Sequence, residues 1–462
     1  MVEEAGGIRA ELINAKGTHE IHVKESWGIM ILEGGNGGLV AELKFRDIVG
    51  AVATGSALEI RTYRKVDRSL WSCWCFCENG DAKVLGCINV QLGSPELSEY
   101  WEKTLSGTEA RGPFVVVVNP SSGTRRGKNI LEREVEPMLR AGRVHFTTLI
   151  TSRANEATEY IRDLEDLGNV EAILCVGGDG TLFEVLQGIR DRADVAQILA
   201  KVKLVPVPAG TGNGLAKSLT YEAGEECNAS SCTFLGIKGM CESMDLIEVQ
   251  SDKKSERMYS FLLLGFGLVA DVDILSETMR YLGEMRLHIA AVYYILRKRL
   301  YKGKVTIIPY VENSAAPTDA VMPAFNAPFE INGFPSSEVV SEGPFCLVWV
   351  VQTSHCTEHM YSGPECKIGS GYFTIYWVEV VSRCDMLSLL LTIDTGGHND
   401  HPKVHRRKAV AYRIEPDTMG ANGEDMKDGF YTLDGEIVPN GAIQGIIRPG
   451  GCRTSMLGPD TS

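Results

Sequence analysis

Three glycine-rich junctions constrain the fold of this chain more than any other feature of its sequence. The first runs from Asn119 to Gly123, the second from Gly177 to Thr181 and the third from Pro208 to Gly214. Continuous apolar runs such as Phe114 to Val118 and Val170 to Val176 precede them, and helical periods follow. Such runs are typical of parallel strands buried on both faces of a sheet. The sequence therefore predicts an α/β layer whose strands end at glycine loops.

Glycine loops at the ends of parallel strands are suited to binding phosphate. A missing side chain lets the backbone approach an anion closely, and a helix N-terminus offers unpaired N–H groups to it. One such loop could be an ordinary tight turn, but parallel strands bring all three to one edge of the sheet. None is a Walker A sequence, which excludes an ordinary P-loop kinase. We therefore predict a nucleotide site of another architecture.

Asp179 is the candidate catalytic residue. It stands between two glycines directly after a buried strand. At that place a carboxylate can reach both a nucleotide and an acceptor hydroxyl, which is the reach that a general base needs. The alternative is an aspartate that only fixes its own turn.

The chain divides into three predicted domains. Residues 1–110 contain alternating runs such as Leu58 to Tyr63, then a helical stretch from Pro95 to Leu105, which predicts a β-rich domain closed by one helix. This domain looks like a pleckstrin-homology-type module, and that likeness would imply phosphoinositide or protein contacts. A structural β-domain without a ligand is an equal alternative. Residues 111–220 hold the α/β layer.

Residues 221–455 are predicted to form a second, β-rich domain with one long helix from about Ser276 to Leu300. Within it, residues 312–343 are rich in Ala, Pro, Ser and Asn, which predicts an exposed insertion. The expected strands are Met244 to Val249, Phe345 to Thr353, Tyr372 to Val381, Lys408 to Ile414 and Gly429 to Leu433.

The order of these motifs resembles the diacylglycerol kinase catalytic domain that lipid kinases share. The Gly-Gly-Asp-Gly core also occurs in NAD kinases and 6-phosphofructokinases, so it does not choose the substrate alone. Three later segments are similar in order and spacing to sphingosine kinases, and they extend the resemblance from about residue 113 to 450. These segments are Gly267 to Asp273, Leu282 to Arg286 and Leu433 to Glu436.

The resemblance implies an ATP-dependent lipid kinase that phosphorylates the primary hydroxyl of a sphingoid base and uses Mg²⁺. It implies an α/β nucleotide-binding domain followed by a β-sandwich lipid-binding domain, with Asp179 as the base. The implied ATP-binding residues are Asn119, Gly123, Thr151, Gly177, Gly178, Gly180, Thr181, Gly210, Thr211, Gly212, Asn213, Arg280, Arg286, Asp434, Gly435 and Glu436.

Two acidic positions carry the implied substrate and metal roles. Asp273 would face the protonated amine of a sphingoid base, with Asp271 as the less favoured candidate; an aspartate pair that only fixes a loop stays open. Glu436 would lie near Mg²⁺ and contact it through water, because magnesium takes only one or two carboxylates besides waters and phosphate oxygens. Since Asp-Gly between strands is also a hairpin signal, a plain turn at Glu436 stays open.

Two positions depart from the sphingosine kinase pattern. A serine commonly stands where this chain has Gly177, and Leu263 occupies a place where a hydroxyl can support the amine. The apolar run from Cys384 to Ile393 resembles a lid over a lipid-tail channel, although a core segment has the same composition.

Two other functions compete with a sphingoid-base kinase. A ceramide or diacylglycerol kinase would share the loops but would have no use for Asp273. A lipid-responsive binding protein with a silent kinase site belongs to a different class, and the presence of Asp179, Asp273 and Glu436 speaks against it.

Charge and hydropathy limit the partners. A formal net charge of -14 argues against nucleic acid as a partner and against bulk attraction to anionic lipid. No apolar stretch reaches the roughly 20 residues of a spanning helix. Thirteen scattered cysteines and an N-terminus without signal features predict a cytoplasmic protein with peripheral membrane association through a local patch. A homodimer stays open.

Two groups of potential metal ligands have simpler interpretations. Cys73, Cys75 and Cys77 alternate on an expected strand, which favours a packed row over a zinc site. The polar segment of His398, His401 and His405 favours an exposed loop.

Overall fold

The computed structural model describes most of the chain from residue 111 onward and, before that, mainly the strands. The described residues are 10–14, 17–24, 28–33, 39–44, 47–54, 57–65, 83–91, 99, 102–103, 105, 111–123, 125–279, 282, 285–312, 317, 320–417 and 430–456. No helix within these ranges combines the length and the apolar composition that crossing a membrane requires.

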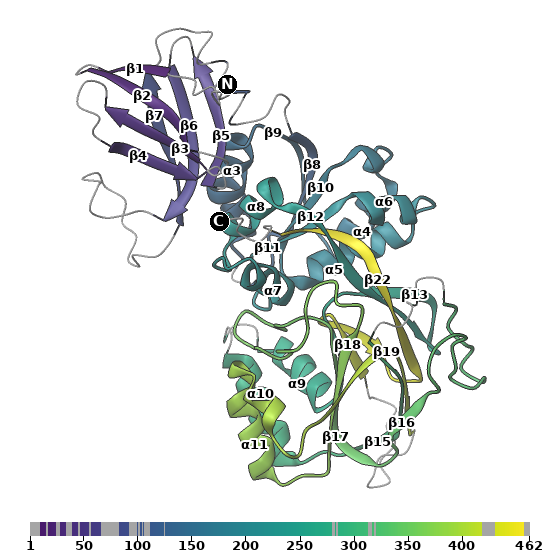
Figure 1. The fold of residues 1–462 in the computed structure, drawn as a ribbon. Helices are drawn as coiled ribbons and strands as arrows, with labels where there is room; N and C mark the ends of the chain where they lie inside the picture. Colours follow the sequence, from purple (N-terminus) through teal and green to yellow (C-terminus); the bar gives the residue numbers. More distant parts are fainter. Residues whose placement is uncertain are drawn as a thin grey trace, which may run out of the picture.

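The N-terminal region forms two antiparallel sheets, of four and three strands (Figure 1). Leu58 and Ile60 are buried while Glu59 and Arg61 are half-buried, which confirms the predicted alternation. Most of the predicted helix from Pro95 to Leu105 lies outside the described residues, as do Cys73, Cys75 and Cys77. The strands are β1 (Ala10–Asn14), β2 (Gly17–Lys24), β3 (Gly28–Glu33), β4 (Leu39–Lys44), β5 (Ile48–Thr54), β6 (Ala57–Lys65) and β7 (Lys83–Gln91).

The α/β layer contains four parallel strands in the order β11-β10-β8-β9. β10, β11 and residues 115–118 of β8 are buried on both faces, as the continuous apolar runs predicted, whereas the edge strand β9 is partly exposed. The elements are β8 (Arg111–Val118), α2 (Gly127–Ile130), α3 (Glu136–Ala141), β9 (Val144–Ile150), α4 (Glu156–Asp163), β10 (Ala172–Gly177), α5 (Asp179–Arg190), α6 (Val195–Lys201), β11 (Lys203–Pro208), α7 (Gly214–Glu222) and α8 (Ala229–Lys238).

Helices cover both faces of this layer. Apolar residues of α4, α5 and α6 pack against one face, and those of α3 and α8 pack against the other. The predicted helical face of α5 is confirmed, because Leu182, Val185, Leu186 and Ile189 are all buried. The carboxyl ends of β8, β10 and β11 therefore lead into the three glycine loops at one edge.

The C-terminal region is a large, mostly antiparallel sheet with three helices on one side (Figure 1). Each strand expected from the sequence is present there. The elements are β12 (Met240–Ser251), β13 (Lys254–Ser260), β14 (Leu263–Gly267), α9 (Leu268–Glu277), α10 (Met285–Arg297), β15 (Tyr301–Pro309), β16 (Glu338–Ser341), β17 (Pro344–Val351), β18 (Phe373–Glu379), α11 (Arg383–Thr392), β19 (His405–Pro416), β20 (Phe430–Leu433), β21 (Glu436–Pro439) and β22 (Ile443–Met456).

The last strand, β22, joins the two regions into one 15-stranded sheet. Its far end pairs parallel with β11, where Lys203 lies opposite Arg453, and along its length it pairs antiparallel with β12. Figure 1 shows β22 reaching from the α/β layer into the β-rich region. The predicted domain boundaries stay predictions, but a break at residue 220 would separate β11 from its neighbour β22.

The described part of the segment 312–343 is only partly the exposed insertion that its composition predicted. Met322, Phe329 and Ile331 are buried in the core of the β-rich region. The Arg413 guanidinium donates to three carbonyl oxygens of this segment, at 2.9 to 3.3 Å. Arg448 donates to the Ala320 carbonyl at 2.8 Å. The prediction missed this anchoring because a polar average composition hides a few buried apolar residues and the carbonyl groups that buried arginines can bind.

The predicted single helix from Ser276 to Leu300 is also wrong. The chain forms α9, which begins earlier at Leu268, and a separate α10. A helix interrupted in this way can turn two different faces to the same cavity.

The N-terminal sheets pack onto the α/β layer through Tyr63. Its ring lies 5.2 Å from the Phe234 ring of α8, and its hydroxyl lies 2.9 Å from the Ser231 hydroxyl. Burial raises the pKa of Tyr63 to about 12.

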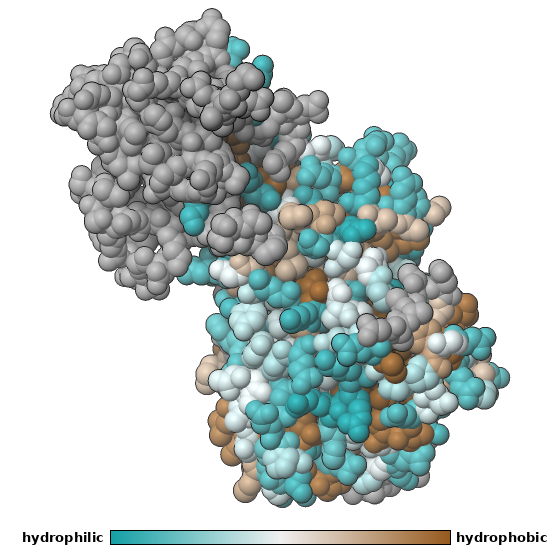
Figure 2. Space-filling model, in the orientation of Figure 1, coloured by the Kyte–Doolittle hydropathy of each residue, from teal (hydrophilic) through white to brown (hydrophobic). Residues whose placement is uncertain are grey.

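Over the part of the chain coloured in Figure 2, hydrophilic residues cover most of the visible face, and smaller hydrophobic areas lie among them.

Candidate active site

A cavity of about 430 Å³ lies where the glycine loops meet the β-rich region. Its polar end carries Asn119, Ser122, Gly123, Gly178, Asp179, Gly180, Thr181, Gly210, Thr211, Gly212, Asp273, Arg286, Gly435 and Glu436. Its apolar part is walled by side chains of α9, α10, α11, β17 and β18, including Val269, Val272, Ala291, Ile295, Leu347, Met386, Leu389 and Leu390. The residues that line the cavity therefore suit one ligand with phosphate groups at the glycine loops and another with a long apolar chain.

The glycine loops lie too close together to hold side chains. A Cβ built on Gly123, whose φ is +51°, would lie 2.7 Å from the Ala209 carbonyl oxygen, and one on Gly210 would lie 2.6 Å from the Cα of Gly178. The cradle thus exposes backbone rather than side chains at the polar end of the cavity. This arrangement fits the triphosphate of a nucleotide.

Asp179 begins α5 and points at the start of α7. Its carboxylate accepts hydrogen bonds from the backbone N–H groups of Gly214 at 2.9 Å and Leu215 at 3.3 Å. Burial raises the pKa of Asp179 above its ordinary value, and these N–H donors oppose that shift. A carboxylate that is more basic than usual and fixed in position beside a phosphate cradle can accept a proton from a hydroxyl.

Asp273 projects from α9 into the same cavity. Burial and the nearby Glu277 raise its pKa to about 7, against the opposing effects of Arg286 and the Thr432 hydroxyl. A buried carboxylate at the edge of ionisation favours a cation as its ligand. Leu263 also lines the cavity, and the nearby Thr432 hydroxyl is buried without a hydrogen-bond partner among the described residues.

Arg286 links α10 to the third glycine loop. One guanidinium nitrogen donates to Glu277 at 2.5 Å and another to the Thr211 hydroxyl at 3.1 Å. The Arg286 Nε and the Thr181 hydroxyl are buried without a hydrogen-bond partner among the described residues. Unpaired buried donors are unfavourable by about 1–3 kcal/mol each, so these two groups suit phosphate oxygens.

The turn between β20 and β21 brings Glu436 to the cradle. A Cβ on Gly180 would lie 3.1 Å from Glu436 Oε1. Asp434 is engaged elsewhere, since its carboxylate accepts from the Ser260 hydroxyl and from three backbone N–H groups at 2.9 to 3.0 Å. Asp434 therefore holds the turn in place, and Gly435 and Glu436 face the cavity.

The carboxylates at the polar end fit a hydrated Mg²⁺ ion rather than a fully protein-bound metal. The described residues contain no group of three or more His, Cys, Asp or Glu side chains that could hold a metal ion. Magnesium bound with nucleotide phosphates needs only one or two carboxylates, and Glu436 beside Gly180 meets that need.

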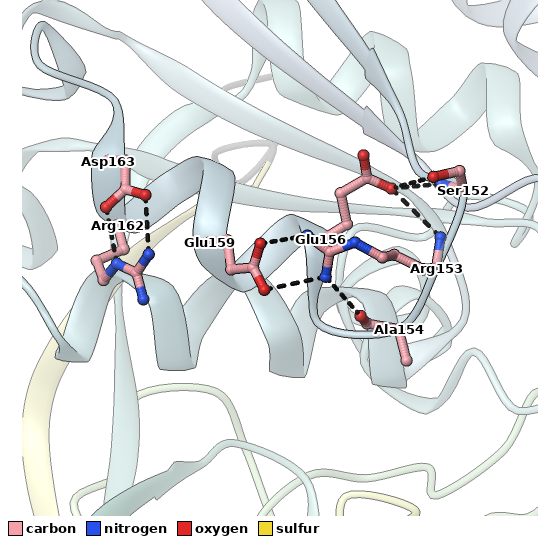
Figure 3. Close-up of polar contacts among 7 residues, drawn as sticks. All are labelled: Ser152, Arg153, Ala154, Glu156, Glu159, Arg162 and Asp163. Atoms are coloured by element: carbon pink, nitrogen blue, oxygen red, sulfur yellow. Dashed lines mark hydrogen bonds and ion pairs between the residues drawn. The ribbon is translucent and has the colours of Figure 1, made fainter.

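Thr151, expected at the nucleotide site, does not line the cavity. Its hydroxyl donates to the Val118 carbonyl oxygen at 3.2 Å. In the adjoining turn the Glu156 carboxylate accepts from the N–H groups of Ser152, at 2.5 Å, and Arg153, at 3.3 Å (Figure 3). Because Glu156 already occupies these donors, the turn before α4 offers little to a phosphate.

Three more expected residues lie beside the cavity rather than in its lining. Asp271 accepts from Arg299 at 3.2 Å and from the Tyr301 hydroxyl, so the structure does not bring it to the substrate position. The amide of Asn213, a residue with φ of +57°, exchanges two hydrogen bonds with Gly210 and fixes the loop. Gly177 makes room for Thr181, since a Cβ there would overlap the Thr181 hydroxyl. Arg280 lies outside the described residues.

Three aromatic residues of the cavity wall escaped sequence reasoning. Trp349 on β17, Tyr376 on β18 and His398 all line the cavity. The expectation that His398 lies in an exposed loop is wrong, because its side chain is buried under α11. The strand pattern could not reveal the wall, since residues facing a cavity and residues facing a core are equally apolar.

Known proteins provide an independent comparison. Residues 113–249 match the family described as the diacylglycerol kinase catalytic domain. Sphingosine kinase 1 of Homo sapiens is 31% identical over an alignment of 351 residues, and the match covers 72% of this chain and 88% of that protein. Sphingosine kinase 2 of Arabidopsis thaliana is 30% identical over an alignment of 339 residues, and the match covers 71% of this chain and 69% of that protein.

Among solved structures, a putative diacylglycerol kinase from Bacillus anthracis str. Sterne is similar in fold. The TM-score is 0.52 at 19% identity, covering 75% of this chain and 98% of that one. This likeness supports a two-part α/β architecture with a large sheet.

Proposed function

The chain belongs to the sphingosine kinase family, and from that premise we propose that it transfers the γ-phosphoryl group of ATP to the primary hydroxyl of a sphingoid base, giving a sphingoid 1-phosphate. One observation carries the choice of lipid. Asp273, a carboxyl with a pKa of about 7, lies between the phosphate cradle and the apolar channel, where the amine of a sphingoid base would stand.

The reaction is an in-line transfer in which the protein mainly positions the two substrates and neutralises the charge of the phosphates. Asp179 accepts the proton of the attacking hydroxyl, and the glycine loops hold the phosphates through backbone N–H groups. Arg286 and Thr181 present their buried donors to phosphate oxygens. When bound near Glu436, Mg²⁺ supplies positive charge to the phosphates. The apolar wall orients the chain of the lipid so that its hydroxyl faces Asp179.

A lipid panel tests this function. Purified protein with Mg·ATP should phosphorylate sphingosine and sphinganine and should act weakly on ceramide and diacylglycerol, which carry no cation for Asp273. Equal transfer to all four lipids would favour a general lipid kinase. No transfer to any of them would favour a binding protein with a silent kinase site.

The pH dependence of lipid choice follows from Asp273. Its carboxyl is largely protonated below pH 7, and its ionised form becomes dominant as the pH rises. We expect kcat/KM for sphingosine to rise by up to about tenfold per pH unit between pH 5.5 and about 7, then to level off. A poor, N-acylated substrate should lack this component, since it needs no ionised partner. Parallel pH profiles for both lipids would contradict the assignment.

We further propose that the protein meets membranes through the outer faces of α10 and α11. Five exposed apolar residues recur on one face of α10, at positions 285, 289, 292, 293 and 296, and Leu387 and Leu391 extend this surface on α11. The two helices are adjacent, and Arg383 of α11 donates to the Leu296 carbonyl oxygen at 2.9 Å. The inner faces of the same helices line the cavity, so a lipid could enter between them.

Charge substitution tests this surface. Leu296→Glu combined with Leu391→Glu should lower binding to phosphatidylcholine–phosphatidylserine vesicles by at least about tenfold, because burial of each leucine contributes about 1.5–3 kcal/mol. Turnover of sphingosine in detergent micelles should change by less than about twofold, as neither residue lines the cavity. Val321→Glu, at a residue 78% exposed in another segment, is the control. If the double variant binds vesicles as well as the wild type does, the proposed membrane contact through α10 and α11 is wrong.

The N-terminal β-domain is proposed as a pleckstrin-homology-like recruitment module. Its two antiparallel sheets of four and three strands support this proposal. In this proposal residues 1–110 recruit the protein, residues 111–220 bind the nucleotide and the β-rich residues 221–455 bind the lipid. The protein is then cytoplasmic and associates peripherally with membranes.

A further inference from the structure

Two polar atoms in the apolar wall of the cavity have no hydrogen-bond partner in the part of the chain that the structure describes. The Trp349 Nε1 and the His398 Nδ1 are buried without a hydrogen bond among the described residues, and the two side chains are only 5% and 4% exposed. Both residues line the cavity, and their ring centroids are 6.3 Å apart. A wall made only for hydrocarbon would not leave two such groups unpaired, since each is unfavourable by itself.

The two atoms have opposite hydrogen-bonding character. An indole nitrogen can only donate. The other ring nitrogen of His398, Nε2, lies 3.0 Å from the Ser362 carbonyl oxygen, which can only accept, and 3.3 Å from Asn399 Nδ2, which already donates to the Gly396 carbonyl oxygen at 3.0 Å. The shorter contact assigns the proton to Nε2. Burial lowers the pKa of His398, which keeps the ring neutral and leaves Nδ1 as an acceptor. One donor and one acceptor together match a hydroxyl group, which accepts one hydrogen bond and donates another.

The neighbouring tyrosine is different. The Tyr376 hydroxyl lies 3.0 Å from Asn399 Oδ1 and is therefore satisfied within the protein. The unpaired state is thus a property of Trp349 and His398 and not of every polar group in this wall.

The strand register places this pair away from the reacting end of the lipid. Thr432, Gly265, Trp349 and Tyr376 lie opposite one another on four neighbouring strands. Thr432 stands beside Asp273, and Trp349 is two strands further, about 10 Å away at the usual strand spacing. A Cβ on Gly265, between them, would lie 2.8 Å from the Thr432 hydroxyl and 2.8 Å from a Val269 methyl group, so the Val269 side chain covers this strand and lines the cavity along the path. A lipid whose amine meets Asp273 would therefore pass Trp349 with the middle of its chain.

We propose that the cavity selects sphingoid bases that carry a hydroxyl group in the middle of the hydrocarbon chain, with Trp349 donating to that hydroxyl and His398 accepting from it. The inference rests on the proposed function, because it uses the amine at Asp273 to set the position of the chain. Trp349 and His398 are then specificity-determining residues of the lipid channel.

A hydroxyl scan of the substrate tests this directly on the full-length protein. Sphinganine is compared with analogues that carry one added hydroxyl at successive chain carbons, 4-hydroxysphinganine among them. We expect a maximum of kcat/KM at a mid-chain position, at least about tenfold above sphinganine, and no such gain for the hydroxyl nearest the head group. A hydroxyl that lowers kcat/KM at every position would overturn the proposal, as would a series without a maximum.

Two variants assign the effect to the wall. Trp349→Phe removes the donor, so the ratio of kcat/KM for the mid-chain-hydroxylated substrate to kcat/KM for sphinganine should fall to about one. Tyr376→Phe removes a hydroxyl that is already satisfied within the protein, so the same ratio should stay at its wild-type value. An unchanged ratio in Trp349→Phe would show that a bound water, not the lipid, satisfies the indole. If the wild type phosphorylates no sphinganine at all, the proposed kinase function fails; if it phosphorylates all analogues equally, only the present proposal fails.

Discussion

Asp179→Asn is expected to lower kcat for sphingosine by about 10² to 10⁴-fold, the usual contribution of a positioned general base. The amide cannot accept the proton of the attacking hydroxyl. Its oxygen can still accept from the Gly214 N–H group, so the junction between α5 and α7 should stay formed. The dissociation constant for ATP should therefore change by less than a few fold. The measurements are single-turnover transfer and ATP binding by calorimetry.

Asp179→Ala is the matched comparison. It removes both acceptors from the start of α7, so it should weaken ATP binding and thermal stability as well as transfer. If Asp179→Asn turns over at a near-normal rate, Asp179 is a structural residue of the loop. Equal losses of ATP affinity in both variants would lead to the same conclusion.

The sequence alone predicts the local parts of this fold well. Periodicity identified the buried strands of the α/β layer and the inner face of α5, because each depends on residues near one another in the chain. It could not reveal that β22 pairs with β11, since Arg453 lies 250 positions after Lys203 and no local pattern marks the pairing. The anchoring of residues 320–331 by Arg413 and Arg448 is non-local in the same way.

The polar end of the candidate site was also easier to predict than its wall. Glycine loops have a recognisable composition, and the structure brings them together around Asp179. Single side chains were harder to place: Asp271 and Asp273 are two positions apart, yet a helix directs one to Arg299 and the other into the cavity. Asp434 and Glu436 differ similarly, because the backbone N–H groups after Ser260 occupy the first of them.

The choice of a sphingoid base over a neutral lipid depends on the charge of Asp273. Asp273→Asn keeps the shape and the capacity to accept a hydrogen bond but removes the charge. We expect sphingosine to lose about 2–3 kcal/mol of recognition, the range of a hydrogen bond between charged groups in a desolvated site. That loss corresponds to a fall of about 30- to 150-fold in kcat/KM.

In this variant kcat/KM for an N-acylated analogue should fall much less than kcat/KM for sphingosine. It can even rise, because the neutral amide of the analogue no longer faces a buried carboxylate. Asp271→Asn is the matched control: it lies two positions earlier on α9 and outside the cavity lining, bound to Arg299 and Tyr301. Its ratio of catalytic efficiencies for the two lipids should equal that of the wild type. If Asp273→Asn lowers kcat/KM for both lipids equally, Asp273 is a structural residue, and the preference for an amine must then arise elsewhere in the cavity.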